Sequence, residues 1–144
     1  MTIISTDKPV RAGLRREIKL LVVDDHLDHF AQIQEFTEMY HPEFKVECKL
    51  ATNPCQALEL SASWEPSVVL LDLHMVSSAL ELLRQLSNTG ATVVATSKVR
   101  LPELSRTAEE YGAVGYHSKG HNLDGIEALV NFASSLATTT HPTH

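Results

Sequence analysis

The chain of 144 residues has only two cysteines, a modest 6% of aromatic residues and no excess of positive charge. Its 12 Lys and Arg against 18 Asp and Glu give a net charge of −6. Because binding to nucleic-acid phosphates needs clustered cations, this balance argues against a nucleic-acid partner. No apolar stretch approaches the roughly 20 residues of a membrane span, and the N-terminal segment has no apolar signal-peptide core. We therefore expect a cytoplasmic protein without membrane insertion.

The two cysteines, Cys48 and Cys55, are expected to be reduced thiols, because no secretory signal accompanies them. A bridge between them is disfavoured, since Cys48 lies in a predicted strand and Cys55 in a predicted helix. The sequence also lacks a Gly-rich phosphate loop and a convincing Ser/His/Asp order. These absences remove the commonest nucleotide-binding and hydrolase patterns.

Strand and helix patterns alternate five times along the chain. The predicted strands are 18–23, 45–51, 68–71, 92–96 and 114–117. The predicted helices are 28–40, 54–64, 78–86, 102–112 and 123–136. These elements make one domain over residues 17–136, with a flexible N-terminal tail (1–16) and a disordered C-terminal tail (137–144).

The strand patterns predict the order of the sheet. Residues 68–71 and 92–96 are continuously apolar, which is typical of the centre of a parallel sheet, whereas 45–51 alternates as an edge strand does. Five βα units without a long insertion predict an α/β fold with helices on both faces. The expected architecture is a flavodoxin-like, doubly wound, five-stranded parallel sheet with strand order 2-1-3-4-5.

Acidic residues follow two of these strands directly. Asp24 and Asp25 end the first strand, and Asp72 ends the third. In open α/β sheets, ligands bind in the crevice at the carboxyl ends of the strands. Three crowded carboxylates repel one another, and a hard divalent cation with oxygen ligands relieves that repulsion. The sequence therefore predicts a carboxylate metal site, although acids at a strand–helix junction can also serve simply to stabilise the helix.

Hydroxyl and ammonium groups are expected at the same edge. Thr96 ends the fourth strand and Lys119 follows the fifth. This set suits phosphoryl transfer to a carboxylate, with Asp72 as the nucleophile. The cation, Lys119 and the Thr96 hydroxyl would then each bind part of the transferring group. Thr96 alone would be interpreted as an ordinary strand residue. Its combination with Lys119 and the rest of the set indicates a functional role.

Four motifs in this order resemble a known family. They are Val22–His26, Leu70–Met75, Ala95–Ser97 and Gly112–Lys119. The chain is similar to the receiver domains of two-component response regulators, in particular to single-domain, chemotaxis-regulator-like members. The resemblance covers about residues 18–136.

The resemblance implies a phosphoryl group on Asp72, donated by a sensor histidine kinase or a phosphotransfer protein. It implies Mg²⁺ as the cofactor, and the implied ligands are Asp24, Asp25, Asp72 and the backbone carbonyl of His74. The protein would be a signalling switch, not an enzyme, because it would catalyse only its own phosphorylation and dephosphorylation.

The resemblance also implies roles around the phosphoacceptor. Thr96 and Lys119 would contact the phosphoryl group, while His74 and Lys98 occupy positions that tune its lifetime. Tyr116 occupies the position of the aromatic switch residue, although an aromatic strand residue can also be plain core. Output to a downstream protein target is expected through the face formed by the fourth helix, fifth strand and fifth helix. A homodimer is a further arrangement that the sequence allows.

Two departures from the family pattern leave an alternative function. The loop after Met75 is about one residue shorter than usual, and Gly120 stands where many members have proline. The alternative is a phosphorylation-independent protein–protein interaction module with the receiver fold. A metal-dependent phosphatase is disfavoured because His74 stands where such enzymes carry a second Asp.

Histidines near the acids offer a second metal chemistry. A transition-metal site could combine the acids with three residues: His26, His29 and His74. Because oxygen ligands favour magnesium, we expect Mg²⁺, with His26 facing solvent beside the crevice.

Overall fold

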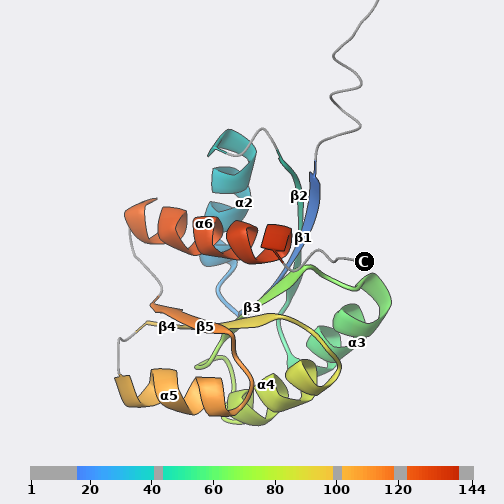
Figure 1. Ribbon diagram of the computed structural model, residues 1–144, viewed down its shortest axis with the longest axis vertical. Helices are drawn as coiled ribbons and strands as arrows, with labels where there is room; N and C mark the ends of the chain where they lie inside the picture. Colours follow the sequence, from blue (N-terminus) through green and yellow to red (C-terminus); the bar gives the residue numbers. More distant parts are fainter. Residues whose placement is uncertain (1–15, 41–43, 99–101, 119–122, 140–144) are drawn as a thin grey trace, which may run out of the picture.

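The computed structural model describes residues 16–40, 44–98, 102–118 and 123–139, and the described chain alternates strands with helices (Figure 1). The strands are β1 (Arg16–Val23), β2 (Phe44–Ala51), β3 (Val68–Asp72), β4 (Val93–Ser97) and β5 (Gly115–Ser118). The helices are α2 (Leu27–Tyr40), α3 (Pro54–Trp64), α4 (Ala79–Asn88), α5 (Pro102–Glu110) and α6 (Leu123–Thr139). None of these helices has the length and apolar character needed to cross a membrane.

The five strands form one parallel sheet in the order β2-β1-β3-β4-β5, which confirms the predicted fold class and strand order. The central strands β3 and β4 are buried at every position. Strand β2 alternates between exposed and partly buried residues from Lys45 to Leu50, as expected for an edge strand. The register places Val23 beside Leu71 and Asp72 beside Thr96, so the carboxyl ends of three strands lie together.

Helices cover both faces of the sheet, with α2 and α6 on one side and α3, α4 and α5 on the other (Figure 1). Alternate strand residues pack into two separate hydrophobic cores, one on each face of the sheet, because successive side chains of a strand point to opposite faces. On one face Leu21 and Leu71 belong to a core with the α4 residue Leu83. On the other face Leu20 and Leu70 belong to a core with residues of α2 and α6. This double burial fixes the register of β1 and β3 and hence the position of the acids at their ends.

Helix α3 begins as the sequence predicts. Asn53 Oδ1 accepts a hydrogen bond of 2.9 Å from the backbone N–H of Gln56, and Pro54 is the first helical residue. The Gln56 side chain reaches back and accepts from the backbone N–H of Thr52 at 2.9 Å. These bonds satisfy backbone donors that a helix N-terminus otherwise leaves without intrahelical partners.

Helix α5 ends before its predicted last residue. It stops at Glu110, because the chain turns at Tyr111 and Gly112 takes a φ of 117°. A Cβ at Gly112 would lie 2.5 Å from the Cβ of Ser87, so the close approach to α4 needs glycine at this turn.

The segment predicted as a disordered tail, 137–144, begins inside a helix. Helix α6 continues to Thr139, three residues past its predicted end, since no Gly or Pro occurs between its last turn and Pro142. At the other end of the domain, β1 begins at Arg16, within the segment predicted as the N-terminal tail. Residues 1–15 and 140–144, the remainder of both predicted tails, lie outside the described residues.

Candidate functional site

Three carboxylates meet where β1 and β3 end. Asp24 follows β1 directly, and Asp72 is the last residue of β3. Both are 1% exposed, whereas about half of the Asp25 side chain is exposed. One ligand atom from each of these acids, and one from His26, lie within 4.8 Å of one another. The structure therefore brings together Asp24, Asp25 and Asp72 at the sheet edge, as the strand patterns predict.

His26 is exposed beside the crevice, as expected, and its ring also contacts the cluster of acids. Its Nδ1 lies 2.9 Å from Asp24 Oδ1, 3.1 Å from Asp25 Oδ1 and 3.8 Å from Asp72 Oδ2. Its backbone N–H also donates to Asp24 Oδ1 at 2.9 Å. The side chain is 45% exposed, yet the ring turns Nδ1 toward the acids because they offer strong acceptors within reach.

His29 holds the other oxygen of Asp24. This residue lies in the first turn of α2, is 8% exposed, and its Nδ1 lies 2.9 Å from Asp24 Oδ2. Since a carboxylate only accepts, the ring donates from Nδ1. Its Nε2 has no hydrogen-bond partner among the described residues. Asp24 is thus fixed through both oxygens, a role that the sequence did not reveal because it depends on the helix packing over the strand end.

The turn after β3 orients Asp72. The backbone N–H of His74 donates to Asp72 Oδ1 at 2.9 Å, and that of Met75 donates to the Asp72 carbonyl at 3.3 Å. The His74 ring then reaches across to β4, where its Nε2 lies 2.7 Å from the Oγ of the buried Ser97. This contact joins the ends of β3 and β4, so His74 does not reach the acids through its ring.

The remaining predicted site residues lie around this cluster. Thr96 is buried opposite Asp72 in the register, and its hydroxyl donates to the Leu71 carbonyl at 3.3 Å. Lys98 is exposed just after β4. Tyr116 is partly buried in β5, beside Ala95, and packs against the core under α3, α4 and α5. Lys119 lies outside the described residues.

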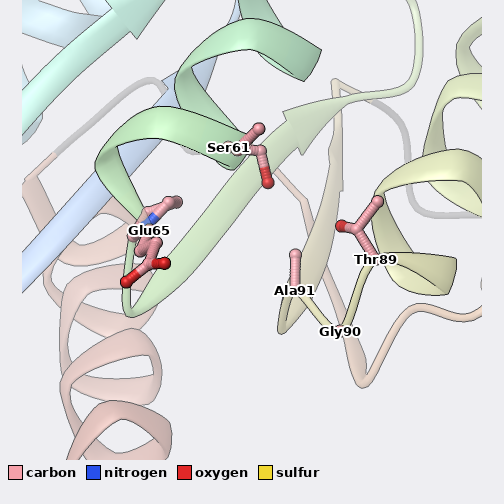
Figure 2. A pocket seen from close by; sticks show the side chains of 7 residues that line it. Ser61, Glu65, Thr89, Gly90 and Ala91 are labelled. Carbon is pink, nitrogen blue, oxygen red and sulfur yellow. The ribbon is translucent and has the colours of Figure 1, made fainter.

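A cleft of about 440 Å³ lies at the opposite end of the strands (Figure 2). It lies between the ends of α3 and α4, where the chain enters β3 and β4. Its lining residues are Ser61, Ala62, Glu65, Pro66, Thr89, Gly90 and Ala91. None of these belongs to the cluster around Asp72, so the cleft is separate from the candidate site.

A scan against protein-family models finds no match, and neither does a search of curated proteins by sequence. Solved structures do match. A response-regulator receiver domain from Francisella aligns with a TM-score of 0.72 at 21% identity, covering 85% of this chain and 98% of that one. A response regulator from Thermotoga maritima aligns with a TM-score of 0.73 at 19% identity and the same coverage. The chain has the receiver-domain fold.

A third neighbour has the same fold. It is the Mn²⁺-bound form of response regulator Rcp1, with a TM-score of 0.71 at 20% identity, covering 88% of this chain and 99% of that one. In the present receiver fold, the carboxylate oxygens and the imidazole nitrogen at the strand ends are donors suited to a divalent cation. The acidic cluster, with Asp72 on the central strand, also fits a phosphorylation site.

Proposed function

We propose that the protein is a phosphorylation-dependent signalling switch that accepts a phosphoryl group on Asp72 with Mg²⁺. The observation that carries this proposal is the position of Asp72. Its carboxylate is buried at the end of the central strand β3, yet lies within a group of acids that a cation would neutralise. A sensor histidine kinase or a phosphotransfer protein would be the donor.

The transfer step places a carboxylate oxygen of Asp72 on phosphorus. The new O–P bond forms as the bond from phosphorus to the donor's leaving atom breaks, and the electron pair stays with the leaving group. Mg²⁺ held by Asp24, Asp25, Asp72 and the carbonyl of His74 would supply positive charge for the phosphoryl oxygens.

The protein's own groups position the reacting carboxylate. The His74 N–H fixes Asp72 Oδ1, and His29 fixes Asp24 beside it. Lys119 is proposed as a second positive contact for the phosphoryl group. Lys98 and the His74 ring flank the strand ends, where we propose that they control access of water to the phosphoryl group and hence its lifetime.

The signal would leave the site through Thr96 and Tyr116. The Thr96 hydroxyl makes only a long bond of 3.3 Å to the Leu71 carbonyl, which it can exchange for a phosphoryl oxygen. Tyr116 is one strand away, in β5, and the output face that we propose is formed by α5 (the fourth predicted helix), β5 and α6.

Intact mass spectrometry after incubation with acetyl phosphate and Mg²⁺ tests the proposal. The wild type should gain the mass of one phosphoryl group, and Asp72→Asn should gain none. Asp25→Asn should lose Mg²⁺-dependent phosphorylation while keeping its fold by circular dichroism. Asp28→Asn is the matched control, because Asp28 is an exposed acid of the same segment outside the cluster.

Failure of the wild type to form an adduct that depends on Asp72 would overturn the proposal. The same fold would then serve as a phosphorylation-independent interaction module. The shortened loop after Met75 motivates that alternative.

A further inference from the structure

We infer that His26 is a metal ligand, and that the site binds Co²⁺, and to a smaller extent Mn²⁺, through this nitrogen more tightly than an all-oxygen site would. This inference rests on the proposed function, since it concerns the same site. It adds a ligand and an ion preference that neither the carboxylates nor the fold imply.

The donor spacing around His26 fits one coordination shell. Neighbouring ligands of an octahedral ion with bonds of about 2.1 Å lie about 3.0 Å apart, and opposite ligands about 4.2 Å apart. His26 Nδ1 is 2.9 Å from the nearest oxygen of Asp24 and 3.1 Å from that of Asp25. Its distance of 3.8 Å to Asp72 Oδ2 lies between the two values. Small side-chain movements would therefore bring all four donors onto one ion.

His26 can present its lone pair without leaving the cluster. In the hydrogen-bonded state its Nδ1 carries the proton, because the carboxylates only accept. With 45% of the side chain exposed, the neutral ring can carry that proton on Nε2 instead. The ion then takes the place of the hydrogen between Nδ1 and the oxygens, and the net charge of the ring does not change.

The buried His29 is a separate observation that supports a metal site here. It donates from Nδ1 to Asp24 Oδ2, which directs the other oxygen, Oδ1, toward His26. Ligating carboxylates are commonly oriented by such hydrogen bonds from residues behind them. A histidine that is 92% buried, with Nε2 lacking a partner among the described residues, is costly for the fold. The hydrogen bond from His29 to Asp24 orients a proposed metal ligand, which is a reason to bury this histidine.

The imidazole nitrogen determines which ions the site binds more tightly. Mg²⁺ prefers oxygen and gains little from a nitrogen donor, whereas affinity for mixed nitrogen and oxygen sites rises along Mn²⁺, Co²⁺ and Ni²⁺. Replacing His26 should therefore lower Co²⁺ affinity much more than Mg²⁺ affinity. The unequal loss of Co²⁺ and Mg²⁺ affinity distinguishes a metal ligand from a residue that only supports the fold. A folding defect would lower the affinity for both ions together.

Isothermal titration calorimetry with Co²⁺ and with Mg²⁺ tests the inference. Every sample carries His141→Ala and His144→Ala, so that tail histidines do not bind the probe. His26→Ala should lower Co²⁺ affinity about tenfold or more and change Mg²⁺ affinity less than about twofold. His26→Asn keeps a hydrogen-bond donor but is a poor ligand, so it should not restore Co²⁺ affinity. His117→Ala is the matched control and should leave both affinities unchanged, because the His117 ring lies against Phe132 and is outside the cluster of acids.

Mn²⁺ gives a spectroscopic reading of the same ligand. Electron spin-echo spectra of the Mn²⁺ complex should show coupling to one imidazole ¹⁴N, which is absent in His26→Ala and His26→Asn. Equal loss of Co²⁺ and Mg²⁺ affinity in His26→Ala, full recovery in His26→Asn, or no ¹⁴N coupling would each overturn the inference. Phosphorylation of Asp72 with Mg²⁺ is measured separately, so the proposed function can stand when the ligand role fails, and the reverse.

Discussion

The crowding of Asp24 and Asp72 predicts that removing one charge stabilises the metal-free protein. Their ligand atoms lie within 4.8 Å, and both carboxylates are 1% exposed. Two unit charges at that distance repel by about 3.5 kcal/mol at an effective dielectric constant of about 20. His26 offsets part of this repulsion through its contacts with both acids. We therefore expect Asp72→Asn to raise the free energy of unfolding by about 1–3 kcal/mol in a chelator.

The substitution keeps the hydrogen bond from the His74 N–H to residue 72. The Asn amide oxygen can still accept from the His74 N–H, which now donates to Asp72 Oδ1 at 2.9 Å. Packing therefore changes little, and the charge is the main difference between the two proteins. A divalent ion should reverse the order, because a ligand that binds only the native state adds stability as its concentration exceeds its dissociation constant.

Urea unfolding, followed by the fluorescence of the single tryptophan, Trp64, measures both effects. Each protein is unfolded in EDTA and again with excess Mg²⁺, and Asp28→Asn serves as a surface-charge control. An Asp72→Asn variant that is less stable than the wild type in EDTA would refute the reasoning. So would an equal gain from Mg²⁺ in both proteins.

Three further predictions concern packing, thiol chemistry and helix capping. Gly115→Ala should cost about 1–3 kcal/mol in thermal unfolding, because the new Cβ would lie 2.5 Å from Cε2 of Phe132, and Phe132→Leu should recover part of the loss. Burial raises the pKa of the Cys48 thiol from 9.0 to about 11, so iodoacetamide near neutral pH should label the exposed Cys55 first, as peptide mapping would show. Because the folded state favours the protonated thiol, stability should also fall as the pH rises from 9.0 to about 11. Asn53→Ala should cost about 1 kcal/mol in urea unfolding, since the Gln56 N–H loses its acceptor.

The sheet could be predicted from the sequence because the hydrophobic pattern of each strand is local. The apolar runs at 68–71 and 92–96 predicted the buried central strands, and the alternation at 45–51 predicted the edge strand. Helix ends were less predictable. The early end of α5 follows from the contact of Gly112 with Ser87 in α4, which lies 25 residues away in the chain.

The sequence predicted those parts of the site that depend only on residue type and on position at the end of a strand. Asp24 and Asp72 could be placed at one edge because each follows a strand of the same sheet. The direction of the His26 ring could not, because it depends on how the chain turns after β1 to bring Nδ1 within 2.9 Å of Asp24 and 3.1 Å of Asp25. The link between His29 and Asp24 likewise needs the packing of α2 against the sheet. The geometry of the turn after β1 decides the first orientation and the packing of α2 the second, and the residue pattern alone shows neither.

The two outer strands have a consequence for self-association. Sheet edges expose unpaired backbone groups, and a long, flat, apolar edge invites pairing with another molecule. Strand β2 presents charged, exposed side chains at Lys45, Glu47 and Lys49, and β5 at the other edge has only four residues. Both features discourage strand addition between molecules, so any homodimer of this protein should form through its helices rather than by extending its sheet.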